Sequence, residues 1–256
     1  MNSVSTAPKP AASARDVLWE NVQTVIVALI LAMGIRFIIA QPFRIPSGSM
    51  QPTLLVGDYI VVTKWSYGYS RFSFEPLNFG IPKGRLLAHA PKRGDVVVFR
   101  PPTHEDKDYV KRLIGMPGDK VQVLDGVLYI NGAAVPRTPL GPVAFKDENG
   151  DVQQITEFEE TLPGGVRYIT FDRRRDGDYD RTPVYDVPAG HYFFMGDDRD
   201  LSEDSRSADV GFVPFDHLVG KAQFVALSFD PSETHIFQPW TWFTGMRSNR
   251  LLKATP

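Results

Sequence analysis

The 256-residue sequence contains no cysteine, which excludes disulfide bonds, thiolate nucleophiles and cysteine-ligated metals. Positive and negative charges nearly balance, with 28 lysines and arginines against 30 aspartates and glutamates, so no basic excess indicates a nucleic-acid ligand. No glycine-rich nucleotide loop is visible, and no group of histidines and carboxylates has the spacing of metal ligands. We therefore expect no cofactor, no metal and no nucleic-acid partner.

One apolar stretch is long enough to cross a bilayer. Residues 22–40 contain few polar side chains, and nineteen residues are about the length of a membrane span. We predict a transmembrane anchor over residues 17–40, after a disordered leader over residues 1–16. A cleaved signal peptide is the alternative, although no small-residue cleavage pattern is followed by a separate mature start. Charges flank the stretch on both sides, so the positive-inside rule barely decides its orientation.

A serine pair follows this stretch directly. Ser47 and Ser49 flank a glycine, with Pro46 before them and Pro52 after them. Because prolines restrict the backbone to extended or turned conformations, a hydroxyl could be presented rigidly here, as a nucleophile requires. The alternative is that both serines only cap a turn.

A serine nucleophile needs a base within hydrogen-bond reach. The five histidines lie in no motif-like context, whereas Lys111 lies in the short apolar run 108–115. A lysine buried in such a strand loses part of its preference for the charged form, and Ser-Lys pairs are a known variant of the catalytic triad. Strand alternation places Arg112 on the opposite face from Lys111, so the two have different roles. A surface lysine on an edge strand is the alternative.

The part of the chain after the apolar stretch predicts a mostly β fold. It contains many short runs of β-branched residues bounded by turn residues, and Asn131-Gly132 predicts a tight hairpin turn. We predict an N-terminal transmembrane helix followed by an antiparallel β-sheet catalytic domain, which carries an inserted, smaller β-rich domain. The predicted boundaries are residues 41–136 and 191–256 for the catalytic domain and 137–190 for the insertion. We interpret the charged runs 157–160 and 172–176 within the insertion as solvated surface.

Three blocks in a fixed order resemble bacterial type I signal peptidase: residues 46–54, residues 109–119 and residues 196–206. The resemblance implies a Ser-Lys serine endopeptidase in which Ser49 is the nucleophile and Lys111 the general base. It implies an oxyanion hole made by the Ser47 hydroxyl and the Ser49 backbone amide. It also implies three supporting residues: Ser202, which hydrogen-bonds and orients the lysine, and the ion pair of Asp204 and Arg206.

The resemblance also implies the substrate and the place of action. The substrate is an exported preprotein cut after a small-x-small pattern such as Ala-x-Ala, through an acyl-enzyme. Six positions match residues that line the family's shallow apolar pockets: Phe43, Ile45, Met50, Leu54, Tyr109 and Val110. Each of them could instead be ordinary core. The enzyme is expected to be a monomer in the bacterial inner membrane, with its catalytic domain on the extracytoplasmic, periplasmic side and with preproteins and the phospholipid bilayer as partners.

Some features depart from this pattern or leave it open. Asp198 and Leu201 stand where the family commonly has asparagine. The aromatic stretch 236–243 suits either membrane contact or a packed core turn. Two other functions remain as alternatives: a dedicated Ser-Lys maturation peptidase of the conjugation-pilus type, and a catalytically inactive anchored domain that binds peptides.

Overall fold

The computed structural model describes residues 14–74, 84–146, 151–174, 176–234, 238 and 240–255 of the chain. Most of the leader predicted over residues 1–16 lies outside the described residues. Residues 236, 237 and 239 of the C-terminal aromatic stretch lie outside them as well.

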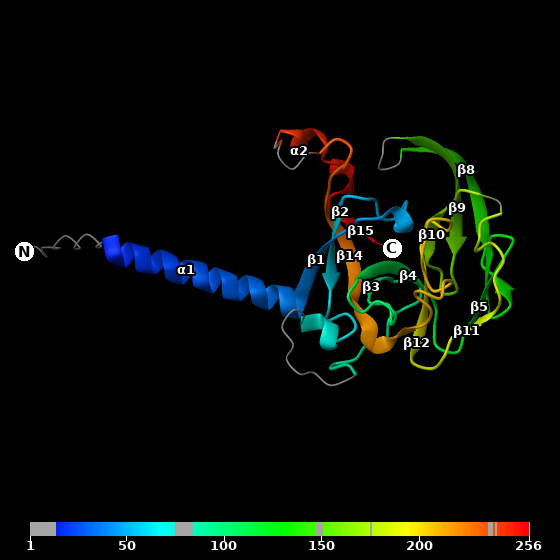
Figure 1. The fold of residues 1–256 in the computed structure, drawn as a ribbon, viewed down its shortest axis with the longest axis horizontal. Helices are drawn as coiled ribbons and strands as arrows, with labels where there is room; N and C mark the ends of the chain where they lie inside the picture. The colour runs from blue at the N-terminus through cyan, green and yellow to red at the C-terminus, as the bar shows by residue number, and fades with distance from the viewer. Residues whose placement is uncertain are drawn as a thin grey trace, which may run out of the picture.

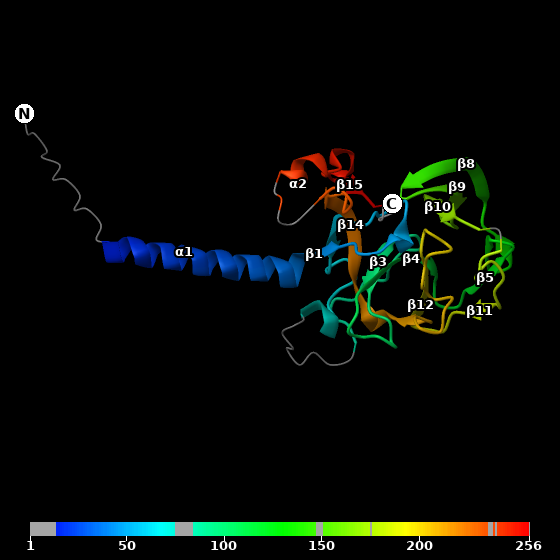
Figure 2. The same ribbon diagram turned by 45° about the horizontal axis from the view of Figure 1, so that its top comes forward.

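One long helix stands clear of the rest of the described chain. Helix α1 spans Ala14–Gly34 and continues through the π-helical turn η1, Ile35–Ile39, into the first strand. It projects from the β-sheet body in both views (Figure 1, Figure 2). Its stretch Val17–Gly34 has a mean hydropathy of 1.7, and none of it is buried. A helix this apolar, without protein cover, has the length and composition to cross a bilayer.

The largest sheet has eight strands and is antiparallel throughout. Its strand order is β1-β2-β14-β3-β4-β12-β13, with β15 paired to β14. The predicted mostly β fold, with antiparallel strands after an N-terminal apolar helix, is confirmed. The strands span Ala40–Arg44 (β1), Asp58–Thr63 (β2), Val96–Phe99 (β3), Tyr109–Gly115 (β4), His191–Met195 (β12), Val213–Pro214 (β13), Leu218–Ser228 (β14) and Lys253–Ala254 (β15).

Valine-rich strands in this sheet form the main core. Strand β3 reads Val-Val-Val-Phe and is buried at every position, because a strand covered on both faces needs a continuous apolar run. Strand β2 alternates instead, with Ile60 and Val62 buried. The same core includes Met50 and Leu54, which are 0% exposed. These two side chains therefore fix the segment between β1 and β2 against the sheet.

Two smaller sheets complete the β structure. One has the order β10-β9-β8 and the other β11-β5-β6-β7. Figure 1 shows them on the side of the body away from α1. Their strands span Lys120–Leu124 (β5), Val127–Ile130 (β6), Ala133–Ala134 (β7), Arg137–Lys146 (β8), Val152–Thr161 (β9), Arg167–Asp172 (β10) and Tyr185–Asp186 (β11).

The predicted hairpin turn is confirmed between β6 and β7. Asn131 and Gly132 have φ values of +54° and +80°, the left-handed pair that a tight turn of this kind requires. The predicted division into a catalytic domain and an insertion over 137–190 stays a prediction. Hydrogen bonding runs across its boundary, since Tyr185 pairs with Val121 on β5.

Short helical turns connect the strands. They are η2 (Gly48–Met50), η3 (Arg71–Phe74), η4 (Phe215–His217), α2 (Thr241–Thr244) and η5 (Ser248–Arg250). Turn η2 lies between β1 and β2, and η5 packs beside β14.

The charged runs of the insertion are not all solvated, and that interpretation is wrong for two residues. Glu160 is 0% exposed and accepts a 2.8 Å hydrogen bond from Arg199. The side chain of Arg173 is 11% exposed and pairs with the buried Asp198. Glu160 lies near the end of β9, and its carboxylate can be buried there because Arg199 compensates its charge.

The C-terminal aromatic side chains are on the surface. Trp240, Trp242 and Phe243 are 67%, 45% and 84% exposed, so the packed-core alternative is wrong for these three residues. Membrane contact by this stretch stays a prediction.

Candidate active site

The serine pair lies on a short, well-anchored turn. Ser47 is extended, with φ −134° and ψ 156°, and the chain then turns through η2. The amide of Gln51 donates to the Gly48 carbonyl at 2.9 Å and closes the turn. Ser49 is 6% exposed. The turn is rigid because the side chains of Met50 and Leu54, which follow Ser49, are locked in the core.

Lys111 reaches this turn from the middle of the large sheet. It lies on β4, between β3 and β12, and is 4% exposed. Its Nζ donates to Ser49 Oγ at 2.5 Å. The Tyr109 ring lies 5.7 Å from the same amine. The structure therefore brings together the two residues predicted as nucleophile and base, and the surface-lysine alternative is wrong.

Burial lowers the pKa of Lys111 to about 8, although the carboxylates of Asp204 and Glu203 act in the opposite direction. Removing a cation from water favours its neutral form, and here this effect exceeds the attraction of the two acids. A neutral amine accepts a proton, which an ordinary surface lysine cannot do at neutral pH. Lys111 thus has the pKa and the position of a general base.

Ser47 lies beside Ser49 on the same turn. The two hydroxyl oxygens are 3.5 Å apart, and Ser47 is exposed where Ser49 is buried. Ser47 is thus a polar group at the mouth of the site, and its predicted role in an oxyanion hole stays a prediction.

The third block lies behind the serine and the lysine. Arg206 donates to both carboxylate oxygens of Asp204 at 2.8 Å, and the Gly196 amide donates to the same carboxylate at 2.9 Å. Burial by itself raises the pKa of Asp204, but the ion pair and these hydrogen bonds hold it below its usual value. Asp204 is therefore a fixed negative charge near Lys111.

Ser202 is in place but does not make the expected hydrogen bond. It is 2% exposed and packs against Gly196, where a Cβ would lie 2.2 Å from its hydroxyl and 2.4 Å from the Ser49 carbonyl. Its Oγ has no partner at hydrogen-bonding geometry among the described residues, although it is near enough to contribute to the lowered pKa of Asp204. Its role in orienting Lys111 stays a prediction.

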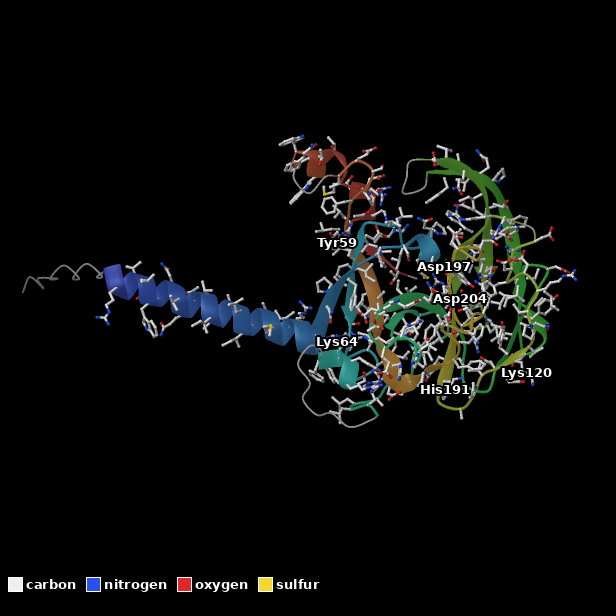
Figure 3. All side chains as sticks on the ribbon, viewed as in Figure 1. Tyr59, Lys64, Lys120, His191, Asp197 and Asp204 are labelled. Carbon is white, nitrogen blue, oxygen red and sulfur yellow. The ribbon has the colours of Figure 1, made fainter. Side chains whose placement is uncertain are left out.

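Asp197, for which the sequence indicated no role, connects the serine segment to the lysine strand. Its carboxylate accepts from Arg112 at 2.8 and 2.7 Å and from Thr53 Oγ1 at 2.5 Å. Arg112 is 0% exposed. Figure 3 shows Asp197 and Asp204 close to each other near the middle of the body. The available signal was the alternation on β4, since an arginine opposite Lys111 in a buried strand needs a buried acid.

A cleft of about 540 Å³ opens over the serine and the lysine. Of the six predicted pocket residues, only Tyr109 and Val110 line it. Ile45, Met50 and Leu54 lie in the core, with Phe43 packed against them. Substrate contact by all six stays a prediction. The cleft residues are Pro46, Ser47, Ser49, Lys107, Asp108, Tyr109, Val110, Lys111, Leu201 and Glu203.

The two departures from the family pattern occupy different surroundings. Leu201 is 54% exposed and lies on the wall of the cleft. Asp198 is 0% exposed and forms an ion pair with Arg173. Burial raises the pKa of Asp198, and the hydrogen bonds and charge of Arg173 oppose that rise. An aspartate is stable at this position because Arg173 supplies its counter-ion.

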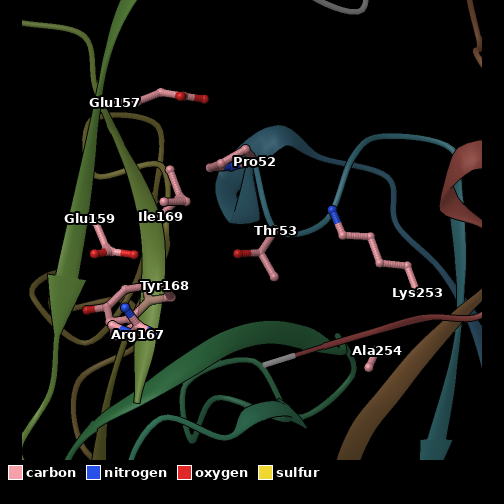
Figure 4. A pocket seen from close by; sticks show the side chains of 9 residues that line it. All are labelled: Pro52, Thr53, Glu157, Glu159, Arg167, Tyr168, Ile169, Lys253 and Ala254. Carbon is pink, nitrogen blue, oxygen red and sulfur yellow. The ribbon is translucent and has the colours of Figure 1, made fainter. Parts of the chain in front are cut away.

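A second pocket, of about 350 Å³, lies between β9 and β10 and the segment that follows the serine turn. Figure 4 shows Glu157 and Glu159 on one side of it, with Lys253 on the other and Thr53 between them. Neither Ser49 nor Lys111 lines this pocket.

Comparison with known proteins gives consistent matches. The family described as signal peptidase, peptidase S26, matches residues 18–227. Signal peptidase I of Rickettsia typhi (strain ATCC VR-144 / Wilmington) is 47% identical over 206 residues, which cover 77% of this chain and 76% of that protein. Signal peptidase I of Rickettsia akari (strain Hartford) is 43% identical over 236 residues, with 89% and 85% covered. A crystal structure of a signal peptidase I from Enterococcus faecalis V583 is 26% identical, has a TM-score of 0.31, and covers 52% of this chain and 97% of its own.

Proposed function

Since the chain belongs to the signal peptidase, peptidase S26, family, we propose that it is a membrane-anchored serine endopeptidase that removes signal peptides from exported preproteins. The observation that carries the proposal is the hydrogen bond of 2.5 Å from Lys111 Nζ to Ser49 Oγ inside a buried site. A serine becomes a nucleophile when an adjacent base takes its proton, and the lowered pKa of Lys111 makes it such a base.

Acylation is the first half of the reaction. Ser49 Oγ attacks the scissile carbonyl while its proton passes to the neutral Lys111 amine. The Ser47 hydroxyl and the Ser49 amide donate to the oxyanion of the tetrahedral intermediate, an effect worth roughly 10² to 10³ in rate for one such donor. The protonated lysine then donates to the departing amine, which leaves as the new N-terminus of the mature protein.

Deacylation repeats the same proton transfers with water. Lys111 takes a proton from a water molecule, which attacks the acyl-enzyme and releases the signal peptide with a free carboxylate. Ser202, Asp204 and Arg206 hold the lysine in place during both halves. The ion pair of Asp204 and Arg206, buried and bidentate, supports this role because it leaves the residues behind the lysine little freedom.

The cleft accounts for substrate choice. Tyr109 and Val110 line it together with Ser49 and Lys111, and bulky side chains at these positions would admit small substrate side chains and exclude large ones. This supports cleavage after a small-x-small pattern such as Ala-x-Ala. The substrate backbone adds as an extended strand beside the site.

The anchor keeps the enzyme beside its substrate. The uncovered apolar helix α1 supports a single membrane span in the inner membrane, with the catalytic domain on the periplasmic side. The catalytic domain consists of residues 41–136 and 191–256, with residues 137–190 inserted into it. The enzyme acts as a monomer, because the anchor confines it to the same membrane as the signal peptide and no partner subunit is needed to bring the two together.

Cleavage of a preprotein whose signal ends in Ala-x-Ala tests this function. The full chain in detergent or lipid is compared with its Ser49→Ala and Lys111→Met variants. Lys120→Met serves as a control, because the Lys120 side chain is 62% exposed and forms only a surface ion pair. Wild type and control cut at the junction, and the two site variants do not. A wild type that cuts only one dedicated substrate favours the maturation peptidase, one that binds but never cuts favours the inactive binding domain, and cutting by Lys111→Met shows that the base is a different residue.

A further inference from the structure

The Ser49 turn is connected through hydrogen bonds to an arginine that is distant in the chain and follows a strand of another sheet. The carbonyl of Ser49 accepts a 3.2 Å hydrogen bond from the Asp198 amide. The carboxylate of Asp198 is 0% exposed and accepts from Arg173 Nε at 3.0 Å and from its Nη2 at 2.7 Å. Arg173 directly follows β10 of the three-stranded sheet.

The same guanidinium also contacts the other side of the turn. Arg173 Nη2 donates to Gln51 Oε1 at 3.3 Å. Gln51 is 5% exposed, and its side chain covers Gly48, where a Cβ would lie 3.0 Å from Gln51 Cδ. Arg173 therefore reaches Ser49 from two directions: through Asp198 to its carbonyl, and through Gln51 to the glycine before it.

Arg173 itself is fixed by the surrounding structure. Its backbone amide donates to Asp200 Oδ2 at 2.6 Å, and its Nη1 donates to Gln153 on β9 at 2.6 Å. Two residues before Arg173, the Phe171 amide donates to the Asp197 carbonyl at 2.9 Å, and the Phe171 carbonyl accepts from the Arg199 amide at 3.0 Å. The three-stranded sheet thus presents one arginine, fixed by these hydrogen bonds, to the loop that supports Ser49.

We propose that Arg173 is a positioning residue for Ser49, which it holds in place through Asp198 and Gln51. The proposal rests on the proposed function, in which Ser49 is the nucleophile. Without the guanidinium, the buried Asp198 carboxylate has no counter-ion, so it takes up a proton, moves toward solvent or admits water. In each case the hydrogen bonds to Arg173 are lost, which frees the loop that carries the Asp198 amide and the Gln51 side chain, and with them the Ser49 turn. The three-stranded sheet therefore contributes to catalysis without touching the substrate.

The test is a double-mutant cycle on kcat and KM, with the full chain in detergent and the Ala-x-Ala preprotein as substrate. Arg173→Gln is expected to lower kcat by between about tenfold and a hundredfold at nearly unchanged KM, because it misplaces a reacting group and leaves the cleft intact. In an Asp198→Asn background the buried charge is absent, so Arg173→Gln is expected to cost less than about threefold there. Arg174→Gln is the matched control, since this neighbouring side chain is exposed.

The outcomes separate this proposal from the proposed function. If wild type does not cut, or Ser49→Ala still cuts, the proposed function is wrong and the positioning role with it. If wild type cuts and Ser49→Ala does not, two results overturn the positioning role alone: full activity of Arg173→Gln, or an equal loss in both backgrounds. Should Arg173→Gln fail to fold, Arg173→Lys is measured in both backgrounds instead, because lysine keeps the charge and loses the bidentate geometry. If the Asp198→Asn background restores the thermal stability that the Arg173 substitution removes but does not restore kcat, the positioning role is also overturned.

Discussion

Lys111 Nζ and Ser49 Oγ are 2.5 Å apart, although 62 positions separate the two residues in the chain. The lysine comes from a central strand of the large sheet and the serine from a turn pressed into its core. One arrangement thus does two things: it places the lysine amine against the serine hydroxyl, and it excludes the water that would keep the amine charged.

The first prediction concerns the pH dependence of cleavage. Only the neutral Lys111 amine can take the Ser49 proton, and its pKa is lowered to about 8. We expect kcat to rise with pH through about 8 and then level off. The measurement is a pH profile with a substrate that has no ionising group near the cleavage site. A profile that rises only near the ordinary lysine value of 10.5 contradicts the buried base.

The second prediction concerns stability. The pKa of Lys111 is about 8 in the folded chain and about 10.5 when unfolded, so between these values the unfolded state binds more protons. The free energy of unfolding therefore rises with pH across this window, and below it Lys111 costs the fold roughly 3 kcal/mol. Lys111→Met, which loses activity, is expected to unfold at a higher temperature than wild type at pH 7.

The loss of the hydrogen bond to Ser49, about 1 kcal/mol, offsets part of this gain. The advantage of Lys111→Met should shrink as the pH rises toward 10.5. Thermal unfolding in detergent at pH 7 and pH 10 measures both effects. A variant that is less stable than wild type at pH 7 shows that burial of the lysine is not costly.

The third prediction concerns the space behind the nucleophile. A Cβ at Gly196 would lie 2.2 Å from Ser202 Oγ and 2.4 Å from the Ser49 carbonyl, distances that no packed atoms tolerate. Gly196→Ala must therefore push the serine turn outward, and we expect kcat to fall by at least about tenfold. Gly34→Ala is the control, because a Cβ there meets nothing within 4 Å. Equal activity of the two variants means that the turn can shift without cost.

The fourth prediction concerns the ion pair of Arg112 and Asp197. Their side chains are 0% and 1% exposed, so removing one charge leaves the other buried and unpaired. Arg112→Gln is expected to lower the free energy of unfolding by roughly 3 to 5 kcal/mol. Denaturant unfolding measures it, and the double variant with Asp197→Asn should recover part of the loss.

The matched control for this pair is on the surface. Arg181 and Asp125 form an ion pair while 79% and 71% exposed, and such pairs contribute little because water already solvates both charges. Arg181→Gln should leave the unfolding curve where it is. A similar loss in both variants would show that burial is not what makes the Arg112 pair matter.

Several features of this protein were predictable from local sequence alone. The apolar helix, the hairpin at Asn131 and Gly132, and the buried strand around Lys111 each depend on the order of neighbouring side chains, which periodicity and turn chemistry describe directly. The pairing of Ser49 with Lys111 was predictable because motif-like residues surround each of them. The geometry of the pair was not, since it depends on how two distant segments pack.

What the tertiary structure alone decided is which charges are buried together. The charged runs containing Glu160 and Arg173 looked like solvated surface, yet Glu160 pairs with Arg199 and Arg173 with Asp198, 39 and 25 positions away. Asp197 likewise finds Arg112 across 85 positions. A strand pattern tells which face a side chain occupies but not what covers that face. The sequence by itself indicated the elements and the pairing of Ser49 with Lys111. The counter-ions of the buried charges, and the burial that lowers the pKa of Lys111, exist only where the folded segments meet, because burial and Coulomb energy depend on distance in space.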